Sequence, residues 1–401
     1  MAANVRIPTA PAPLLTVREI RHWDEVERLR PEWIRLLNAN RALHLFATPE
    51  WLGPWWQAYS RNKELRTLVL RDEMAGVVAI LPMYVENIRQ MLPITIRRLR
   101  LLGDGSNDSD DLDVLVQPGY EEAVVDCFLS WSRTSDWDIC ELNCVSPRST
   151  TIKPLRERLV EAGWKNRVTE RPMSVVPLPA TWEEYLKQLS GKERGKIGNR
   201  YRNLLNHYKV NFYRCERVEE IPAALETLFR LHQKRWEAKG LPGAFREAER
   251  RTFYYSMAAA LLAKEQLELW VLELNDEAVA AQIGMRFEDK VYALQEGFDP
   301  ACGADSVGYV LRSQVLRYCI EHGVRQYDFL AGDQDSKQRW GTVVDSYTNL
   351  RFARPGSRGE LHLRFADQAR VIKGWLRAHV PDSVYARAQQ WKVARHLLGV
   401  E

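Results

Sequence analysis

The stretch that decides the fold covers residues 292–342 and reads YALQEGFDPACGADSVGYVLRSQVLRYCIEHGVRQYDFLAGDQDSKQRWGT. It alternates like a strand, breaks into small and polar residues at 304–308, turns helical, and then alternates again. A strand that enters a helix through such a soft loop suits a phosphate or a thioester, because the N–H groups and dipole of a helix N-terminus favour anions. Many sheet proteins use the same layout for packing alone. The rest of the chain must therefore show whether this loop binds a ligand.

Composition places the chain among ordinary folded proteins. Its 401 residues predict two or three domains, and a net charge of +4 does not by itself demand nucleic acid. No apolar run approaches the roughly 18 residues that span a bilayer. The six cysteines form no C-x-x-C pair, which argues against a zinc site and favours reduced thiols in a cytoplasmic protein. Residues 1–20 lack a secretory pattern and are interpreted as a flexible leader.

The order of predicted elements repeats once. Residues 21–180 give helices, a hairpin that turns at 72–76, two strands around an acidic loop, a long helix and a strand. Residues 216–356 give two helices, a hairpin that turns at 275–277, a strand, a helix that ends on Gly323 and a strand. The segments SDWDICEL and RQYDFLAG occupy matching places after the long helix. The sequence therefore predicts two copies of one α/β domain, with mixed sheets flanked by helices.

Two basic segments accompany these domains. Residues 181–215 form a helical bridge that ends in a strand, and a solvated helix face is the default interpretation of its charge, so nucleic acid is not expected as a partner. Residues 357–401 form a helical tail. From residue 361 onward it carries seven basic and three acidic residues together with Trp375 and Trp391. This pattern is typical of an amphipathic helix that rests on an anionic membrane surface, although packing on the second domain remains open.

Several motifs carry a resemblance to a known family. The segments LHQKRWEAKG, QEGFDP, residues 306–340 and the upstream DSDDLDVLV resemble the CelD/BcsL-like branch of the GNAT acyltransferases. That branch is similar to the tandem-GNAT FemAB transferases, and some bacterial ceramide synthases also resemble it. The resemblance extends roughly from residue 46 to residue 354 and implies two GNAT-like domains, of which residues 216–356 bind the donor.

The resemblance implies acyl-CoA as a co-substrate. The donor would be bound by the loop and helix start and by two nearby cations: Ser306, Val307, Gly308, Tyr309, Arg312 and Lys337. Many GNATs carry a fuller Gln/Arg-x-x-Gly-x-Gly/Ala loop, whereas only Ser-Val-Gly remains here. An acyl-tRNA donor is therefore not excluded by the loop, and an ordinary helix cap by Ser306 is the plain alternative.

Glu296 is the first candidate for a general base. It lies on the strand before the loop, and alternation puts it on one face with Leu294 and Phe298. Burial between these apolar neighbours predicts a raised pKa and therefore a better base. A strand glutamate at a solvated splay of the sheet is the alternative.

Asp328 is a second candidate, since a carboxylate between Tyr327 and Phe329 is costly unless it is paired. We expect Lys337, Arg325 or Arg339 as its partner, and a purely structural ion pair is equally compatible with the pattern. Open α/β sheets bind ligands at the carboxyl ends of strands, so Asp333 and Trp340 are expected to contact the substrate. Lys337 is expected to hold the thioester oxygen or a phosphate.

His232, Arg235 and Trp236 lie on one helix, and His232 and Trp236 share a face. We expect His232 to be catalytic and the other two to line the acceptor site, although a lone helix histidine is more often structural. Asp110 and Asp111 belong to a loop expected to reach across the cleft toward the acceptor. That loop lacks the glycine and glutamate of an EF-hand, so no metal is expected.

The sequence predicts an enzyme that transfers an acyl group from acyl-CoA to an amine or hydroxyl of a cell-envelope precursor. N-acylation of a long-chain, sphingoid-type amine, as in bacterial ceramide synthesis, is the leading hypothesis. Acylation of an exopolysaccharide such as cellulose, aminoacyl-tRNA-dependent transfer and a non-enzymatic scaffold are the alternatives. The expected location is the cytoplasm, with peripheral contact to the inner membrane through the tail.

Overall fold

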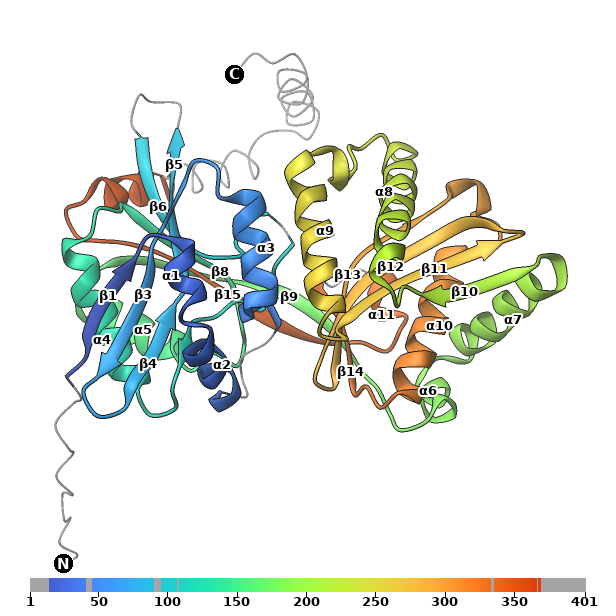
Figure 1. Ribbon diagram of the computed structural model, residues 1–401, viewed down its shortest axis with the longest axis horizontal. Coiled ribbons are helices and arrows are strands. Elements are labelled where there is room, and N and C mark those ends of the chain that lie inside the picture. The colour runs from blue at the N-terminus through green and yellow to red at the C-terminus, as the bar shows by residue number, and fades with distance from the viewer. Residues whose placement is uncertain are drawn as a thin grey trace, which may run out of the picture.

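The chain folds into two α/β halves that lie side by side (Figure 1). The computed structural model describes residues 14–40, 45–89, 95–106, 108–332, 335–365 and 367–368. We call β1 to β8 with α1 to α5 the N-half, and α6 to β14 the C-half. Strands β9 and β15 run between the two halves.

The helices and strands have the following bounds. The helices are α1 Trp23–Glu27, α2 Arg30–Ala39, η1 Leu45–Ala47, α3 Pro49–Tyr59, α4 Glu121–Thr134, α5 Ile152–Glu161, α6 Trp182–Gln188, α7 Gly191–His207, η2 Val218–Glu220, α8 Ile221–Glu237, η3 Ala244–Arg246, α9 Ala248–Leu262, η4 Pro300–Cys302, α10 Val307–Glu321 and α11 Asp335–Gln338. The strands are β1 Thr16–Ile20, β2 Lys63–Leu65, β3 Thr67–Asp72, β4 Gly76–Leu81, β5 Met83–Arg89, β6 Thr95–Leu101, β7 Leu115–Val116, β8 Ile139–Val145, β9 Lys165–Pro177, β10 Val210–Arg214, β11 Leu267–Leu274, β12 Glu277–Phe287, β13 Lys290–Phe298, β14 Gln326–Ala331 and β15 Val343–Ala353.

One long sheet passes through both halves. Among the described residues it has 11 strands in the order β10-β11-β12-β13-β14-β9-β15-β8-β6-β5-β2. A 4-stranded sheet, β1-β3-β4-β7, completes the N-half. The hairpins expected at both places are present as β3–β4 and β11–β12. Asn275 and Asp276 have φ of 52° and 67°, the left-handed conformation that a tight hairpin turn requires.

Strands β9 and β15 join the halves. They pair antiparallel along eleven residues, from Val343 opposite Val175 to Ala353 opposite Lys165. The C-terminal end of β9 also pairs with β14 of the C-half, and β15 pairs with β8 of the N-half. The second domain, expected to run to residue 356, therefore returns to the N-half along β15.

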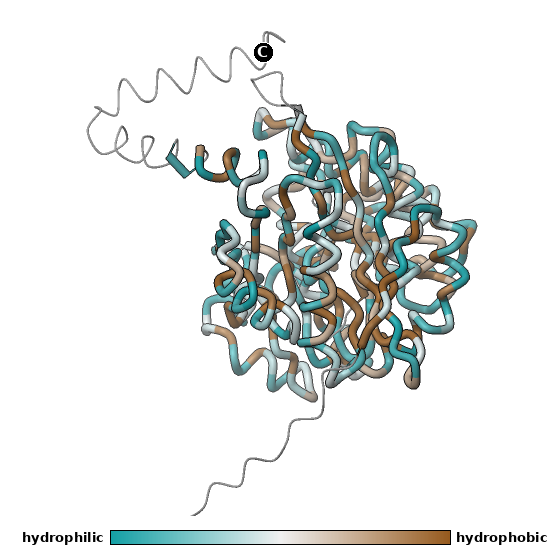
Figure 2. Tube along the Cα trace, turned by 90° about the vertical axis from the view of Figure 1, so that its left-hand side faces the viewer, coloured by the Kyte–Doolittle hydropathy of each residue, from teal (hydrophilic) through white to brown (hydrophobic). Residues whose placement is uncertain are grey.

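The hydrophobic core is shared between the halves. Apolar side chains concentrate on the interior strands, and hydrophilic residues lie on the outer loops (Figure 2). Helices α3 and α9 meet at the junction, where the rings of Trp51 and Phe253 are 5.0 Å apart. Helices α8 and α9 cover one face of the C-half sheet, and α6, α7 and α10 pack against the other. Both faces of this sheet are thus buried.

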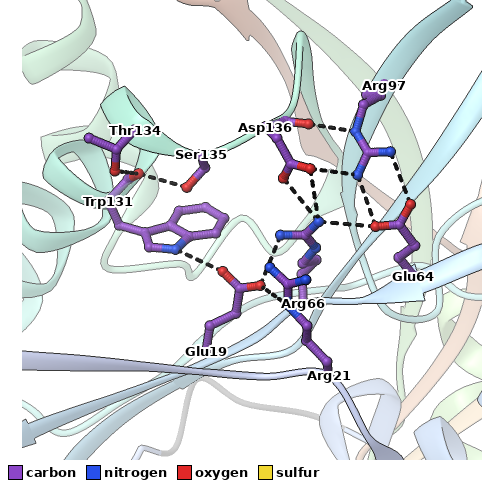
Figure 3. A network of polar contacts seen from close by, with 9 residues as sticks. All are labelled: Glu19, Arg21, Glu64, Arg66, Arg97, Trp131, Thr134, Ser135 and Asp136. Carbon is purple, nitrogen blue, oxygen red and sulfur yellow. Dashed lines mark hydrogen bonds and ion pairs between the residues drawn. The ribbon is translucent and has the colours of Figure 1, made fainter.

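A network of ion pairs ties the edges of the N-half together (Figure 3). The Arg66 guanidinium is only 3% exposed and contacts Glu19, Glu64 and Asp136 at 2.9, 3.0 and 2.9 Å. Arg97 on β6 pairs with Glu64 at 2.9 Å. The three ion pairs of Arg66 offset the cost of burying its guanidinium, and the network joins β1, β2, β6 and the loop before β8.

The terminal segments differ in part from expectation. Residues 16–20, expected to belong to the flexible leader, form β1, which pairs with β3 from Thr16 opposite Arg71 to Ile20 opposite Thr67. Most of the basic tail predicted at residues 357–401 lies outside the described residues. Among the residues that are described, no helix combines the length and apolar character needed to cross a membrane.

Candidate functional site

The site begins where β13 and β14 separate. The two strands run parallel and pair at only three positions, from Lys290 opposite Gln326 to Tyr292 opposite Asp328. Beyond these positions β13 continues to Phe298 without pairing to β14. A bulge in the β12–β13 ladder after Ile283 accompanies the separation. The gap between the strands opens toward their carboxyl ends, where ligands of α/β sheets bind.

Helix α8 packs directly on the separating strand. A Cβ added at Gly297 would lie 2.4 Å from the backbone nitrogen of His232, so only glycine permits this approach. The close contact brings the last turns of α8, with His232, Arg235 and Trp236, over the end of β13. Arg235 consequently meets Glu296, the residue before the glycine, at 2.9 Å.

An inner cavity of about 360 Å³ lies at this junction. Both halves and the strands that join them contribute polar or charged side chains to its wall: Asp108, Asp110, Arg171, His232, Arg235, Gln282, Glu296, Arg312 and Lys337. Trp236, Leu294 and Phe329 supply apolar surface. Most of the residues that the sequence assigned to catalysis or to the acceptor therefore share one cavity.

An outer cavity of about 230 Å³ lies against the start of α10. It is lined by residues of the soft loop and the helix start, together with cations and rings around them: Lys196, Glu296, Phe298, Cys302, Gly303, Ser306, Val307, Gly308, Tyr309, Arg312, Ser336, Arg339 and Trp340. The predicted donor residues Ser306, Val307, Gly308, Tyr309 and Arg312 are thus brought together. Glu296 and Arg312 line both cavities and form the wall between them.

The start of α10 is not an ordinary capped terminus. Ser306 occupies the N-cap position with φ of 58°, in the left-handed region, and its side chain makes no capping hydrogen bond. The first turn contains no acidic residue. A Cβ at Gly308 would lie 2.9 Å from the Phe298 ring, so glycine lets this turn approach β13. The uncapped N–H groups and the helix dipole leave an anion-binding position facing the outer cavity.

Glu296 has the opposite pKa shift from the one predicted. Burial acts to raise its pKa, but the guanidinium groups of Arg312 and Arg235 outweigh burial and lower it. Both arginines contact the carboxylate directly. Arg235 also lies 4.8 Å from the Phe298 ring, and Arg312 lies 4.9 Å from the Phe329 ring. The sequence prediction took only the apolar neighbours into account. The two arginines, which it did not include, make this carboxylate a weak base.

His232 is buried and neutral at physiological pH. Its Nε2 accepts a hydrogen bond from the Trp236 indole at 2.9 Å. Burial, followed by the charges of Arg235 and Arg250, lowers its pKa to about 4. With Nε2 accepting, the neutral ring carries its proton on Nδ1. The imidazole therefore positions Trp236 and has no free lone pair with which to take a proton.

Asp328 does not line the inner cavity. It is fully buried and pairs with Lys290 at 2.6 Å, and it accepts the backbone N–H of Leu330 at 2.7 Å. The partners expected for it, Lys337, Arg325 and Arg339, are not the ones observed. Lys290 is the residue two positions before Tyr292 on the neighbouring strand, a proximity that only the parallel register of the sheet reveals.

The side chain of Lys337 is hydrogen-bonded to backbone carbonyl groups. Its ammonium donates to the carbonyl oxygens of Phe329, Leu330, Ala331 and Gly332 at 2.6–3.3 Å. An ammonium has three donors, so these carbonyls leave none for a thioester oxygen or a phosphate. Leu330 has φ of 59°, and the lysine stabilises this irregular end of β14. Trp340, expected at the acceptor, instead lines the outer cavity.

The acidic loop of the N-half does reach the inner cavity, through two of its aspartates. Asp108 pairs with Arg250 at 2.5 Å and accepts the Tyr254 hydroxyl at 2.9 Å. Asp110 accepts the N–H of Ala331 at 3.0 Å and lies 3.5 Å from Arg171. Asp111 is buried outside both cavities, and burial, opposed by Lys290 at 3.9 Å, raises its pKa to about 6. Asp333 lies outside the described residues.

Among the wall residues that the sequence did not identify as site residues are Asp108, Arg171, Gln282 and Gln295. Asp108 belongs to the acidic loop but was not singled out, and Arg171 lies on the strand that joins the halves. Gln282 is 2% exposed, and its Oε1 has no hydrogen-bond partner in the described structure. A lone glutamine inside the apolar run AVAAQIGM was the signal that could have found it. The described residues contain no cluster of three His, Cys, Asp or Glu side chains able to hold a metal.

Comparison with known protein families gives a match that lies mostly within the second half of the chain. Residues 191–338 match the family described as Acetyltransferase (GNAT) domain. That match includes α7, which sequence analysis placed in the bridge. A comparison with curated proteins gives no match.

Solved structures match over most of the chain. FemX has 13% sequence identity and a TM-score of 0.57, covering 81% of this chain and 96% of its own. A conserved protein of unknown function from Bacteroides thetaiotaomicron has 12% identity and a TM-score of 0.53, covering 85% of this chain and 100% of its own. A tandem GNAT protein from the clavulanic acid biosynthesis pathway has 14% identity and a TM-score of 0.45, covering 86% and 100%.

At these identities the structural matches establish the fold and not the substrate. The predicted α/β fold class with mixed sheets flanked by helices is confirmed, and residues 191–338 match a GNAT domain. The GNAT acetyltransferase domain occupies the half that carries the outer cavity.

Proposed function

We propose that this protein is an acyltransferase that moves an acyl group from acyl-CoA to an amine or hydroxyl of a polar acceptor group. The observation that carries the proposal is the pair of cavities that meet at Glu296 and Arg312. The outer cavity, against the uncapped start of α10, takes the anionic donor. The inner cavity takes the acceptor, and the thioester lies at the wall between them.

The reaction is a direct transfer. The acceptor nitrogen or oxygen attacks the thioester carbonyl carbon, so that a C–N or C–O bond forms and the C–S bond breaks. The sulfur leaves with the electron pair of that bond and is protonated as the CoA thiol. The attacking group must lose a proton during this step, which requires a base within hydrogen-bond reach.

Asp110 is the base in this proposal. Asp108 is engaged by Arg250, Tyr254 and Tyr59, and Glu296 is engaged by two guanidinium groups. Asp110 accepts one backbone N–H on Oδ2, lies 3.5 Å from Arg171 through Oδ1, and also neighbours the Cys144 thiol. Its remaining lone pairs can accept the proton, and Ala331 holds the carboxylate at the carboxyl end of β14.

The polar end of the acceptor enters the inner cavity. Carboxylates and cations dominate the wall of the inner cavity, and Trp236 supplies one flat apolar side. This lining suits an amine flanked by hydroxyl groups. A long-chain amino alcohol is the first acceptor to test, because Trp236 and the basic tail favour a lipid, and its chain would remain outside the polar cavity. An amino sugar unit of an exopolysaccharide has the same polar head and is the second.

A thiol-release assay tests the proposal. The full chain is mixed with acetyl-CoA or palmitoyl-CoA and, in turn, with sphinganine, glucosamine or no acceptor, and free CoA thiol is followed with the product by mass spectrometry. We expect acceptor-dependent thiol release with one acceptor class. Absence of CoA binding, combined with tight and steeply salt-dependent binding of aminoacyl-tRNA, would assign the protein to the other donor class.

Membrane contact through residues 357–401 is part of the proposal for a lipid acceptor. The measurement is flotation of the full chain, and of a chain that ends at Pro355, with vesicles of phosphatidylglycerol. Each basic residue near anionic headgroups contributes about 1 kcal/mol, so only the full chain should float. Equal flotation of both chains would remove this support for a lipid acceptor.

A further inference from the structure

One side chain in the wall of the inner cavity has a hydrogen-bonding atom that the protein itself does not use. Gln282 lies on β12, is 2% exposed and lines this cavity. Its Oε1 atom accepts no hydrogen bond within the part of the chain that the structure describes. A buried acceptor without a donor destabilises the folded state. A ligand that donates an N–H or O–H group to Oε1 is therefore favoured at this place in the wall.

The other end of the same amide group is fixed. Its Nε2 atom donates to the hydroxyl of Tyr327 at 2.7 Å, and Tyr327 is fully buried. Because Nε2 can donate whereas Oε1 can only accept, the amide cannot turn over without losing this contact. The tyrosine thus holds the amide in one orientation, with Oε1 as its remaining polar atom.

A buried donor lies near this acceptor. Gln282 stands opposite Glu296 in the β12–β13 ladder, and Arg312 pairs with Glu296 and neighbours the Tyr327 hydroxyl. The Nε of Arg312 is buried and also has no hydrogen-bond partner among the described residues. A hydroxyl group both donates and accepts, whereas an ammonium group only donates and would face this guanidinium. A hydroxyl therefore fits the two unused atoms best.

Gln282 and the proposed base stand at different places in the cavity. Asp110 is held by the N–H of Ala331, four residues beyond Tyr327 on β14. Strands β12 and β14 flank β13 on opposite sides, and neighbouring strands lie about 4.8 Å apart. The carboxylate and the amide would therefore contact two different atoms of one acceptor.

We propose that Gln282 determines specificity for the acceptor by accepting a hydrogen bond from a hydroxyl group next to the attacking amine, while the Nε of Arg312 donates to the oxygen of that hydroxyl. This inference rests on the proposed function and specifies its acceptor as a vicinal amino alcohol rather than a simple amine. The hydroxyl is bound and is not acylated. Long-chain amino alcohols and 2-amino sugars both carry a hydroxyl on the carbon beside the one that bears the amine.

Two amines of equal chain length test the inference. Thiol release from palmitoyl-CoA is measured with sphinganine and with octadecylamine, which lacks the hydroxyl groups, and kcat/KM is compared. If the acceptor is a sugar, glucosamine and cyclohexylamine form the corresponding pair. A site built to bond a substrate hydroxyl rejects the analogue without it, so the native protein should prefer the amino alcohol by at least about a hundredfold.

The variants locate this preference. Gln282→Met keeps a side chain of similar length without the acceptor, and the preference should fall below about tenfold, through a loss with the amino alcohol alone. CoA affinity should stay near native. Tyr327→Phe keeps the ring but releases the amide, and the preference should fall by several-fold. Gln326→Leu is the matched control, because Gln326 precedes Tyr327 on β14 and lines neither cavity. It should retain the native preference.

Equal kcat/KM values of the native protein for the two amines would overturn the inference while leaving the acyltransferase proposal intact. A Gln282→Met protein that is folded by thermal melting and keeps the native preference would overturn it as well. Absence of CoA binding together with absence of transfer to all four amines would refute the proposed function, and the inference with it.

Discussion

The two halves contain the same supersecondary unit, but the side chains at the helix start and in the neighbouring cavity differ. In the N-half, β6 and β8 run parallel and pair at three positions around α4, and in the C-half β13 and β14 do so around α10. Arg98 on β6 contacts Glu141 at 3.3 Å, and Lys290 on β13 contacts Asp328 at 2.6 Å. By this register Glu141 is the counterpart of Asp328. The matching of SDWDICEL with RQYDFLAG had paired Asp138 with it instead.

The halves differ at the start of the helix. The first turn of α4 contains Glu121 and Glu122, and Glu121 accepts the N–H of Gly119 at 2.8 Å. The first turn of α10 has neither an acidic residue nor a side-chain cap. Because a carboxylate in the first turn of a helix offsets the positive end of the helix dipole, the start of α4 is less favourable for an anion than the start of α10.

The N-half also keeps a polar cavity, of about 240 Å³, near the carboxyl end of β6. Asp104 lies in its wall and is bonded to Arg100 at 2.8 Å and to Asn143 at 2.9 Å. Arg171 lines this cavity and the inner cavity alike. The acidic loop that follows β6 sends Asp108 and Asp110 into the wall of the inner cavity at the junction. In the function proposed above, the C-half binds the donor and the N-half supplies carboxylates for the acceptor.

The largest expected effect comes from the carboxylate that crosses between the halves. Asp110→Asn removes the proposed base and keeps the shape of the side chain. General-base catalysis contributes about 10²–10⁴-fold, so kcat should fall by this order while CoA affinity stays near native. The comparison variant is Asp111→Asn, which alters a neighbour outside both cavities and should affect stability more than kcat. An Asp110→Asn enzyme with more than a tenth of native kcat would place the base elsewhere.

The two equivalent ion pairs should differ in their contribution to stability. Asp328→Asn removes the close partner of the buried Lys290 and leaves it only the Asp111 carboxylate, 3.9 Å away, which should cost about 3 kcal/mol of unfolding free energy. Glu141→Gln should cost about 1–2 kcal/mol, because its partners Arg98 and Arg351 reach solvent with side chains 21% and 40% exposed. Urea denaturation of both variants measures the difference. Equal losses would contradict the stronger burial of the C-half pair.

The buried histidine should make stability depend on pH. The His232 pKa falls from 6.5 to about 4 on folding. Between these values the unfolded chain binds a proton that the folded chain does not, so stability decreases as the pH falls from 6.5 toward 4. From pH 7 to pH 5 this amounts to about 2 kcal/mol. Urea denaturation of native protein and of His232→Gln at both pH values should show a smaller loss in the variant, and identical losses would contradict the assignment.

The smallest effect on turnover is expected at Glu296. Glu296→Gln keeps the shape but removes the charge that pairs with Arg235 and Arg312. If the carboxylate only organises these cations, kcat should fall less than about tenfold and CoA affinity should rise slightly, because more positive charge faces the donor. A loss of kcat of a hundredfold or more would restore Glu296 as the base.

Local sequence patterns predicted helices, strands and loops better than they predicted which side chains form ion pairs and hydrogen bonds. The loop at residues 304–308 and the helix that ends before Gly323 were predicted correctly, since each follows from neighbours in the chain. The alternation around Glu296 was wrong, because the bulge at Leu294 places Leu294 in the core under α8 and α9 and Phe298 in the core under α10. Lys290 beside Asp328, and the carbonyls around Lys337, depend on strand register and on a left-handed residue at Leu330. The lowered pKa of Glu296 has the same origin, because its cations come from two helices that pack onto β13 only in the folded protein.

Long-range exchange between the halves could not be read from the sequence either. The repeat suggested two self-contained domains, yet β15 pairs with β8 and β9 across the junction. The acidic loop was expected to reach across a cleft with Asp110 and Asp111. Asp108 and Asp110 line the cavity and Asp111 does not, and the backbone at Asp111 is left-handed, with φ of 55°.

The stoichiometry of CoA binding tests the central claim most directly. Isothermal titration of CoA into the full chain should give one site per chain, because, of the two equivalent helices α4 and α10, α10 is the one whose first turn has no acidic residue. Gly308→Glu should abolish that site by placing a carboxylate where the diphosphate binds, and thermal melting checks that the variant remains folded. Two sites per chain, or a single site that survives in a folded Gly308→Glu protein, would contradict the assignment of the donor to the C-half.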